Sequence, residues 1–131
     1  MDITTERSDI EKLIFSFSDA FNVSDVSSVV STFATDGVLM PNNGPSAKGH
    51  AAIKALYESL FKTFTINITY TIDEIVINGD YAYARTNSIV ETLIHANGDR
   101  ITLLNKELFV IKKEQAQWKI ADYIFNNTGK N

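Results

Sequence analysis

Residues Arg100–Phe125 read RITLLNKELFVIKKEQAQWKIADYIF, and this stretch decides the fold. Both halves are rich in β-branched and aromatic residues, and the segment Lys113–Gln117 between them has no apolar side chain larger than Ala116. This pattern predicts two antiparallel strands joined by a short turn. The first strand carries apolar side chains on both faces, with Leu104, Leu108 and Val110 on one and Leu103, Phe109 and Ile111 on the other. We expect the chain's own helices to cover one face and a partner subunit to cover the other, which predicts a homodimer through the outer sheet face.

The composition is that of an ordinary globular domain. The chain has 131 residues, of which 44% are hydrophobic and 21% charged, and we predict one domain over residues 1–131. A formal net charge of -4 and the lack of a basic patch argue against nucleic acid as a partner. Cysteine is absent, which excludes disulfides and thiolate metal sites. With no leader pattern and no run of about eighteen apolar residues, we expect a cytoplasmic protein with no membrane partner.

Upstream of the hairpin, apolar residues at spacings of three and four predict three helices. The first spans Thr5–Asn22, a shorter one follows a cap at Ser24, and the third begins after Gly49. Between the second and third helices we expect a turn at residues 35–37, a short strand at residues 38–40, and a loop at residues 41–46.

After Thr63 the apolar period changes to two, which is typical of strands. The phase reverses at Asp73–Glu74, so we expect a bulge there, and Asn78–Asp80 predicts a hairpin turn before a strand over Tyr81–His95. The predicted fold class is therefore α+β: three N-terminal helices packed in the concavity of a strongly curved, mostly antiparallel sheet.

Three segments carry a resemblance to a known family: residues 33–41 (FATDGVLMP), the helix start at Lys48–Gly49, and residues 107–110 (ELFV) through 118–121 (WKIA). They resemble the nuclear-transport-factor-like superfamily of cystatin-like α+β cones, and within it the SnoaL-like and ketosteroid-isomerase-like domains. The resemblance covers about Ile10–Asn126. It implies a cone with an internal pocket and commonly a dimer through the outer sheet face.

The resemblance also implies positions at which catalytic groups can be checked. Ketosteroid isomerases use a carboxylate base, a tyrosine and a neutral acid. In our overlay these three positions fall at Pro41, Phe17 and Leu108, none of which can transfer a proton. Limonene-epoxide-hydrolase-like members use an arginine between two aspartates, and the matching positions are Arg85, Asn87 and Tyr123. We therefore predict that the standard catalytic carboxylates are absent.

The same overlay predicts a largely apolar ligand pocket with a few polar groups, which is the usual make-up of a small-molecule site. The predicted lining residues are Phe17, Phe21, Met40, Tyr57, Tyr83, Arg85, Asn87, Lys106, Leu108, Tyr123 and Phe125. Arg85 pointing inward would need a partner, either an anionic ligand or one of Glu58, Glu91 and Glu107. The expected ligand is a small apolar or weakly anionic molecule.

No metal or cofactor is predicted. His50 and His95 are far apart without acidic residues at metal-ligand spacing, and no glycine-rich phosphate loop is visible. Three functions stay open at this point: a ligand-binding domain, an isomerase, cyclase or lyase, and an assembly module that uses the outer sheet face.

Overall fold

The computed structural model describes residues 3–130, which form three helices and six strands. The helices are α1 (Ile3–Asn22), α2 (Val26–Ser31) and α3 (His50–Thr63). The strands are β1 (Phe33–Met40), β2 (Ala47–Lys48), β3 (Phe64–Asn78), β4 (Tyr81–Ile94), β5 (Arg100–Glu114) and β6 (Gln117–Lys130). The order of helices and strands predicted from apolar periodicity is confirmed.

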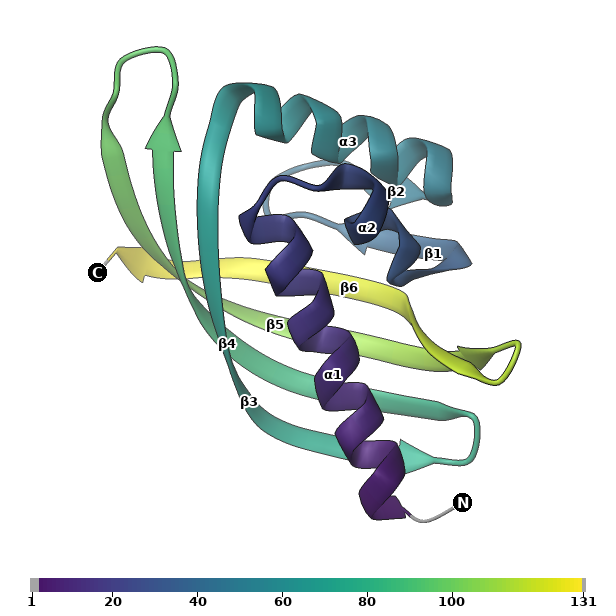
Figure 1. Ribbon diagram of the computed structural model, residues 1–131. Helices are drawn as coiled ribbons and strands as arrows, with labels where there is room; N and C mark the ends of the chain where they lie inside the picture. Colours follow the sequence, from purple (N-terminus) through teal and green to yellow (C-terminus); the bar gives the residue numbers. More distant parts are fainter. Residues whose placement is uncertain (1–2, 131) are drawn as a thin grey trace.

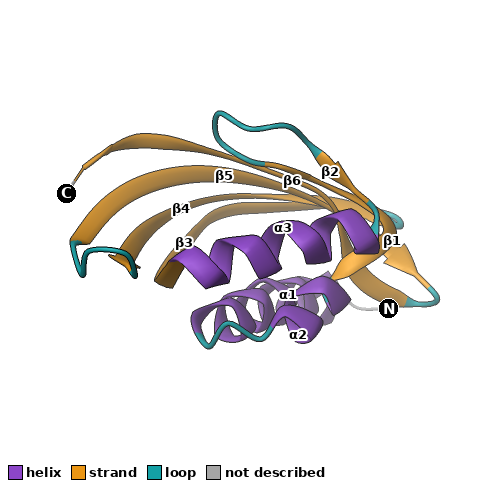
Figure 2. Cartoon of the chain, turned by 90° about the horizontal axis from the view of Figure 1, so that it is seen from above, coloured by secondary structure: helices purple, strands orange, loops and turns teal. Residues whose placement is uncertain are grey.

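The strands form a single curved sheet in the order β2-β1-β6-β5-β4-β3. Only the β1–β6 pair is parallel among these strands, and the sheet bends around the helices, which all lie on its concave side (Figures 1 and 2). Gln115 and Ala116 adopt φ angles of 53° and 65° in the tight turn between β5 and β6. The α+β fold class, with helices in the concavity of a mostly antiparallel sheet, is confirmed.

An aromatic cluster joins α1 to the sheet. Phe17 is 1% exposed, and its ring centroid lies 5.4 Å from that of Tyr123, 6.3 Å from Tyr70 and 6.4 Å from Phe109. The rings of Phe109 and Tyr123 stack at 4.3 Å. These contacts fix α1 across the concave face through buried aromatic area, the kind of contact that dominates core energetics.

The expected bulge lies between Ile72 and Glu74, where the pairing of β3 with β4 shifts by one residue. Beyond it, Ile77 pairs with Ala82 and Ile75 with Ala84. Since residues directly opposite one another share a face, the buried face of β4 is the one with small side chains: Ala82, Ala84, Thr86, Ser88 and Val90.

Two local predictions are wrong. Asp25, not Ser24, caps α2, because its carboxylate accepts a hydrogen bond from the Ser28 backbone N–H at 3.2 Å. Residues 35–37 are not a turn between elements but an irregularity within β1. A Cβ on Gly37 would lie 3.0 Å from the carbonyl oxygens of Ala34 and Ile120, so only glycine fits this close approach without a shift.

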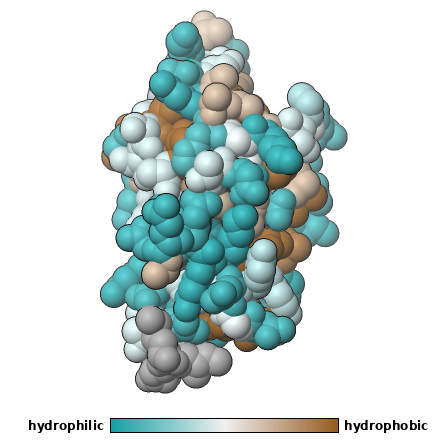
Figure 3. Space-filling view, turned by 90° about the vertical axis from the view of Figure 1, so that its right-hand side faces the viewer, coloured by the Kyte–Doolittle hydropathy of each residue, from teal (hydrophilic) through white to brown (hydrophobic). Residues whose placement is uncertain are grey.

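The end of the molecule that carries the β3–β4 and β5–β6 turns is mostly hydrophilic (Figure 3). Within residues 3–130, no helix combines the length and the apolar character needed to cross a membrane.

Candidate functional site

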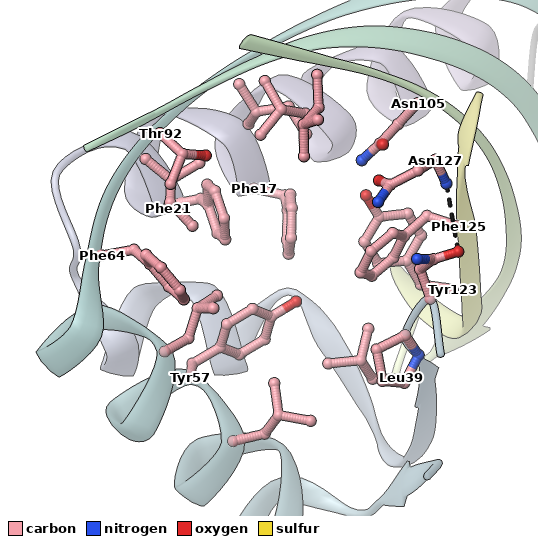
Figure 4. A pocket seen from close by; sticks show the side chains of 18 of the residues that line it. Phe17, Phe21, Leu39, Tyr57, Phe64, Thr92, Asn105, Tyr123, Phe125 and Asn127 are labelled. Atoms are coloured by element: carbon pink, nitrogen blue, oxygen red, sulfur yellow. Dashed lines mark hydrogen bonds between the residues drawn. The ribbon is translucent and has the colours of Figure 1, made fainter. Parts of the chain in front are cut away.

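A cavity of about 380 Å³ lies between the concave sheet face, α1 and α3 (Figure 4). The lining residues are Phe17, Phe21, Leu39, Pro41, Asn42, Leu56, Tyr57, Leu60, Phe64, Ile66, Ile68, Tyr70, Val90, Thr92, Ile94, Ile101, Leu103, Asn105, Tyr123, Phe125 and Asn127. None of these side chains is acidic or basic. The cavity is therefore an apolar enclosure with a few neutral polar groups.

Five of the predicted lining residues do line this cavity: Phe17, Phe21, Tyr57, Tyr123 and Phe125. They come from α1, α3 and β6, where the apolar faces were placed correctly. Whether they bind a ligand stays a prediction.

The placement of Met40 in the cavity is wrong by one residue. Its neighbour Leu39 is 1% exposed and lines the cavity, whereas Met40 is half-buried and lies outside the lining. Successive side chains of a strand point to opposite faces, so the two residues cannot share the cavity wall.

Tyr83 and Arg85 were also placed inside, and the structure puts both on the outer sheet face. The Arg85 guanidinium pairs with the Glu74 carboxylate at 3.3 Å, and the Arg85 side chain is 55% exposed. The Tyr83 hydroxyl donates to the same carboxylate at 3.1 Å, and this hydrogen bond raises the pKa of Tyr83. Arg85 therefore has a protein partner, but a different one from the three glutamates that we considered.

Asn87, Lys106 and Leu108 are misplaced for the same reason. The Asn87 amide donates to the Asp73 carboxylate at 3.1 Å on the outer face, directly beside exposed Lys106 in the neighbouring strand. Leu108 is 37% exposed. Each misplaced residue of β4 and β5 is the immediate neighbour of residues whose side chains lie on the buried face, so its own side chain lies on the outer face.

Hydroxyl groups gather where the cavity is most deeply buried. The Tyr70 and Tyr123 hydroxyls form a short hydrogen bond with each other, and both residues are at most 6% exposed. Tyr57 projects from α3, and its hydroxyl points to the open centre of the cavity (Figure 4). Burial raises the pKa of Tyr57, Tyr70 and Tyr123, so all three are neutral hydroxyls near pH 7.

Asn105 on β5 is the second deeply buried polar group. Its side chain is 8% exposed, and its Oδ1 has no hydrogen-bond partner among the described residues. Asn127 lies beside it in the paired strand β6, with its backbone N–H 3.4 Å from the Asn42 Oδ1 (Figure 4). Asn105 was not among the predicted site residues.

Glu107 is the acid that the sequence reasoning missed. It is 4% exposed on the concave face of β5, where its two oxygens accept hydrogen bonds from the hydroxyls of Thr86, at 2.7 Å, and Ser88. Burial raises the pKa of Glu107, although the two hydroxyls oppose the shift. Our overlay put the family's acid position at outward-facing Leu108, so it skipped a buried carboxyl one residue away.

Glu107 is not among the residues that line the cavity. Its side chain lies between those of Asn105 and Phe109 on one strand face, since alternate residues share a face. Within residues 3–130, no three His, Cys, Asp or Glu side chains are grouped to hold a metal ion.

Solved structures similar to this chain share its whole fold. A ketosteroid isomerase-like protein from Erwinia carotovora atroseptica superposes with a TM-score of 0.88 at 29% identity, covering 93% of this chain and 95% of that one. A candidate scytalone dehydratase from Novosphingobium aromaticivorans gives 0.86 at 17% identity, with 98% and 87% covered. An NTF2-like protein with a cystatin-like fold from the same species gives 0.76 at 19% identity, with 96% and 84% covered. The last two likenesses concern the fold alone.

No curated protein matches the chain significantly. The family of SnoaL-like domains matches residues 15–121, which include α3, the β1–β2 loop and most of the cavity wall. This match and the cone-like arrangement of helices and sheet confirm the resemblance noted in the sequence. The chain belongs to the SnoaL-like domain family.

Proposed function

We propose that this chain binds a small, mostly apolar and uncharged molecule in the cavity between its helices and sheet. The observation that carries the proposal is the lining, which contains neutral polar groups and no ionisable acid or base apart from tyrosine. Small-molecule sites are typically concave and apolar, with a few polar groups that orient the ligand. A cavity of about 380 Å³ is of the size such sites have.

Of the two ligand types expected from the sequence, apolar and weakly anionic, the lining argues against the weakly anionic one. That expectation depended on Arg85, which lies on the outer sheet face, and Lys106, the other cation predicted to line the pocket, is exposed as well. An anion that entered the cavity would lose its hydration without gaining a cation, which is energetically costly. The proposal is therefore restricted to neutral molecules.

Naphthalene and 2-naphthoate, which share one ring system, test this function by calorimetric titration. We expect naphthalene to bind wild-type protein and 2-naphthoate to bind more weakly by at least about tenfold, because the carboxylate must be desolvated. Val90→Phe, which fills part of the cavity, weakens naphthalene binding, whereas Arg85→Ala on the outer face leaves it unchanged. Tighter binding of 2-naphthoate, or loss of binding in Arg85→Ala but not in Val90→Phe, contradicts the proposal.

Catalysis is the second candidate function, as an isomerase, cyclase or lyase that acts on a small hydrophobic carbonyl or polyketide-like substrate. Glu107 favours it, because buried carboxyls with raised pKa values serve as general acids and bases. Against it, both Glu107 oxygens are occupied by Thr86 and Ser88, and Glu107 does not line the cavity. Turnover of such a substrate by wild type but not by Glu107→Gln would favour the enzyme; no turnover would favour the binding domain.

We also propose that the chain forms a homodimer through the outer sheet face. Large apolar side chains are exposed there on four neighbouring strands: Val76, Tyr81, Tyr83, Ile89, Leu108 and Ile124. Clusters of exposed apolar residues on a sheet commonly mark a protein interface. Sedimentation of wild type as a monomer at micromolar concentration contradicts this proposal.

The cytoplasmic location also stays a prediction, which cell fractionation tests.

A further inference from the structure

Two deeply buried polar side chains of the cavity wall form no hydrogen bond within the described part of the chain. They are Asn105, which is 8% exposed and whose Oδ1 is enclosed without a partner among the described residues, and Tyr57, which is 3% exposed and whose hydroxyl faces the cavity (Figure 4). Buried polar side chains in folded proteins almost always have hydrogen-bond partners. A bound molecule that supplies those partners accounts for both residues.

The two side chains lie on opposite walls and face the same space. Tyr57 extends from α3 with its hydroxyl toward the centre of the cavity, and the Asn105 amide extends from β5 on the far wall (Figure 4). Asn105 lies in a row across the sheet with Ser88, Tyr70 and Asn127, because these residues are directly paired in neighbouring strands. Three of the polar side chains that line the cavity, Tyr70, Asn105 and Asn127, are thus gathered in one row.

The end of the cavity near the β4–β5 connection is mostly apolar and less buried, with Thr92 as its one polar side chain among the lining residues. It is formed by half-buried side chains near the β4–β5 connection and the C-terminal end of α3, namely Leu60, Phe64, Ile94, Ile101 and Leu103. The cavity is therefore mostly apolar at this end and richer in buried polar side chains around Tyr57, Tyr70 and Asn105. A molecule with one polar head and an apolar body matches this gradient when the head enters first.

We propose that the polar head is a hydroxyl group, which donates to the Asn105 Oδ1 and accepts from the Tyr57 hydroxyl. This inference rests on the proposed function, since it specifies the ligand of the same cavity. Asn105 Oδ1 can only accept a hydrogen bond, so it requires a donor on the ligand. A ketone oxygen satisfies Tyr57 but leaves Asn105 Oδ1 unpaired, and a hydrocarbon satisfies neither. Among uncharged head groups with a single oxygen atom, only a hydroxyl both donates and accepts, so the ligand class that we infer is an apolar alcohol or phenol.

Three compounds with one ring skeleton test the inference: tetralin, 2-tetralone and 2-tetralol. Calorimetric titration of wild-type protein should give 2-tetralol an affinity at least about tenfold higher than that of 2-tetralone, since a site built to hydrogen-bond a hydroxyl rejects an analogue without it. Asn105→Leu should reduce this preference to about twofold or less, because the acceptor for the hydroxyl is gone. Tyr57→Phe, a smaller change, should reduce the affinity for both oxygen compounds and keep that for tetralin.

Asn126→Leu is the matched control, because Asn126 is an exposed asparagine on the other face of β6 and lies outside the cavity lining. It should preserve the preference of wild type. Two results overturn the hydroxyl inference: equal affinity of wild type for 2-tetralol and 2-tetralone, or an unchanged preference in a folded Asn105→Leu protein. In either case, tetralin binding to wild type still supports the proposed function. Failure of all three compounds to bind wild type overturns both.

Discussion

Replacement of Glu107 by glutamine should change how the stability of this protein depends on pH. The carboxyl of Glu107 is buried and accepts hydrogen bonds from Thr86 and Ser88. No described basic side chain pairs with it, since the ion pairs among residues 3–130 involve Arg85, Lys112 and Lys113 with other acids. Burial therefore raises its pKa above the ordinary value of 4.5.

The sign of the effect follows from proton linkage. Because the folded protein holds this proton more tightly than the unfolded chain, wild type loses free energy of unfolding as the pH rises from 4.5 to the folded pKa. The loss is about 1.4 kcal/mol for each unit by which burial raises the pKa. Glutamine does not ionise, and its amide can accept from one hydroxyl and donate to the other, so the fold is retained. Glu107→Gln should therefore gain stability relative to wild type as the pH rises.

Urea unfolding at about pH 4 and about pH 8 measures this difference, because the two proteins share every other titrating group. Glu114→Gln is a control of opposite sign. Hydrogen bonds from the Thr35 hydroxyl and backbone N–H lower the pKa of Glu114 in the folded protein. Wild type should therefore be more stable to unfolding than Glu114→Gln above about pH 4.5, and this difference should disappear as the pH falls through the pKa of the folded protein. Stability differences between Glu107→Gln and wild type that are the same at both pH values would refute the burial argument.

Four further substitutions test the inner and outer faces of the sheet. Ala84→Leu overpacks a fully buried position and should cost about 1–3 kcal/mol in chemical denaturation, whereas Tyr83→Leu next to it should cost less than about 1 kcal/mol; the reverse order would contradict the register. Arg85→Ala removes one exposed ion pair with Glu74 and should change stability by at most about 1 kcal/mol in thermal unfolding; a much larger loss would mean that Arg85 is buried. Leu108→Lys should shift a dimer to a monomer in sedimentation velocity while the chain stays folded. An unchanged dimer would show that the outer face is not the interface.

Much of the fold was predictable because periodicity reports burial directly. The change from a helical to a strand period after Thr63, the bulge near Asp73 and the glycine turn at Gly79 are each local signals, and the structure contains all three. The cap of α2 was missed by one residue because serine and aspartate are nearly equivalent caps, so sequence cannot choose between neighbours.

The buried face of β4 was also predictable from the hairpin register, whereas the family overlay assigned the opposite face. Asn78 and Tyr81 flank a two-residue turn, so Ile77 must pair with Ala82 and share its face. Since Ile77 belongs to the apolar, buried side of β3, Ala82 and every second residue after it face inward. A shift of one residue in the overlay puts every side chain of the strand on the opposite face of the sheet. This shift placed Tyr83, Arg85 and Asn87 wrongly in the cavity.

The buried polar residues were harder to predict. Asn105 and Glu107 alternate along β5 with the same period as Phe109 and Ile111, so all four side chains lie on one face of the strand. Apolar Phe109 and Ile111 indicate that this face is buried, but asparagine and glutamate are ordinarily exposed. The burial of Glu107 depends on hydrogen bonds from Thr86 and Ser88 in the neighbouring strand, which are tertiary contacts that no local pattern encodes. Asn105 pairs with Ser88 through the strand backbone alone.

A crystal soaked with 6-bromo-2-naphthol would reveal both the place and the orientation of a bound phenol, because anomalous scattering locates the bromine atom. We expect one molecule in the cavity, with bromine near Ile101 and Leu103 and the hydroxyl between Tyr57 and Asn105. Bromine against the outer face near Arg85, or a reversed molecule with bromine beside Tyr123 and its hydroxyl at the apolar end, would contradict this expectation.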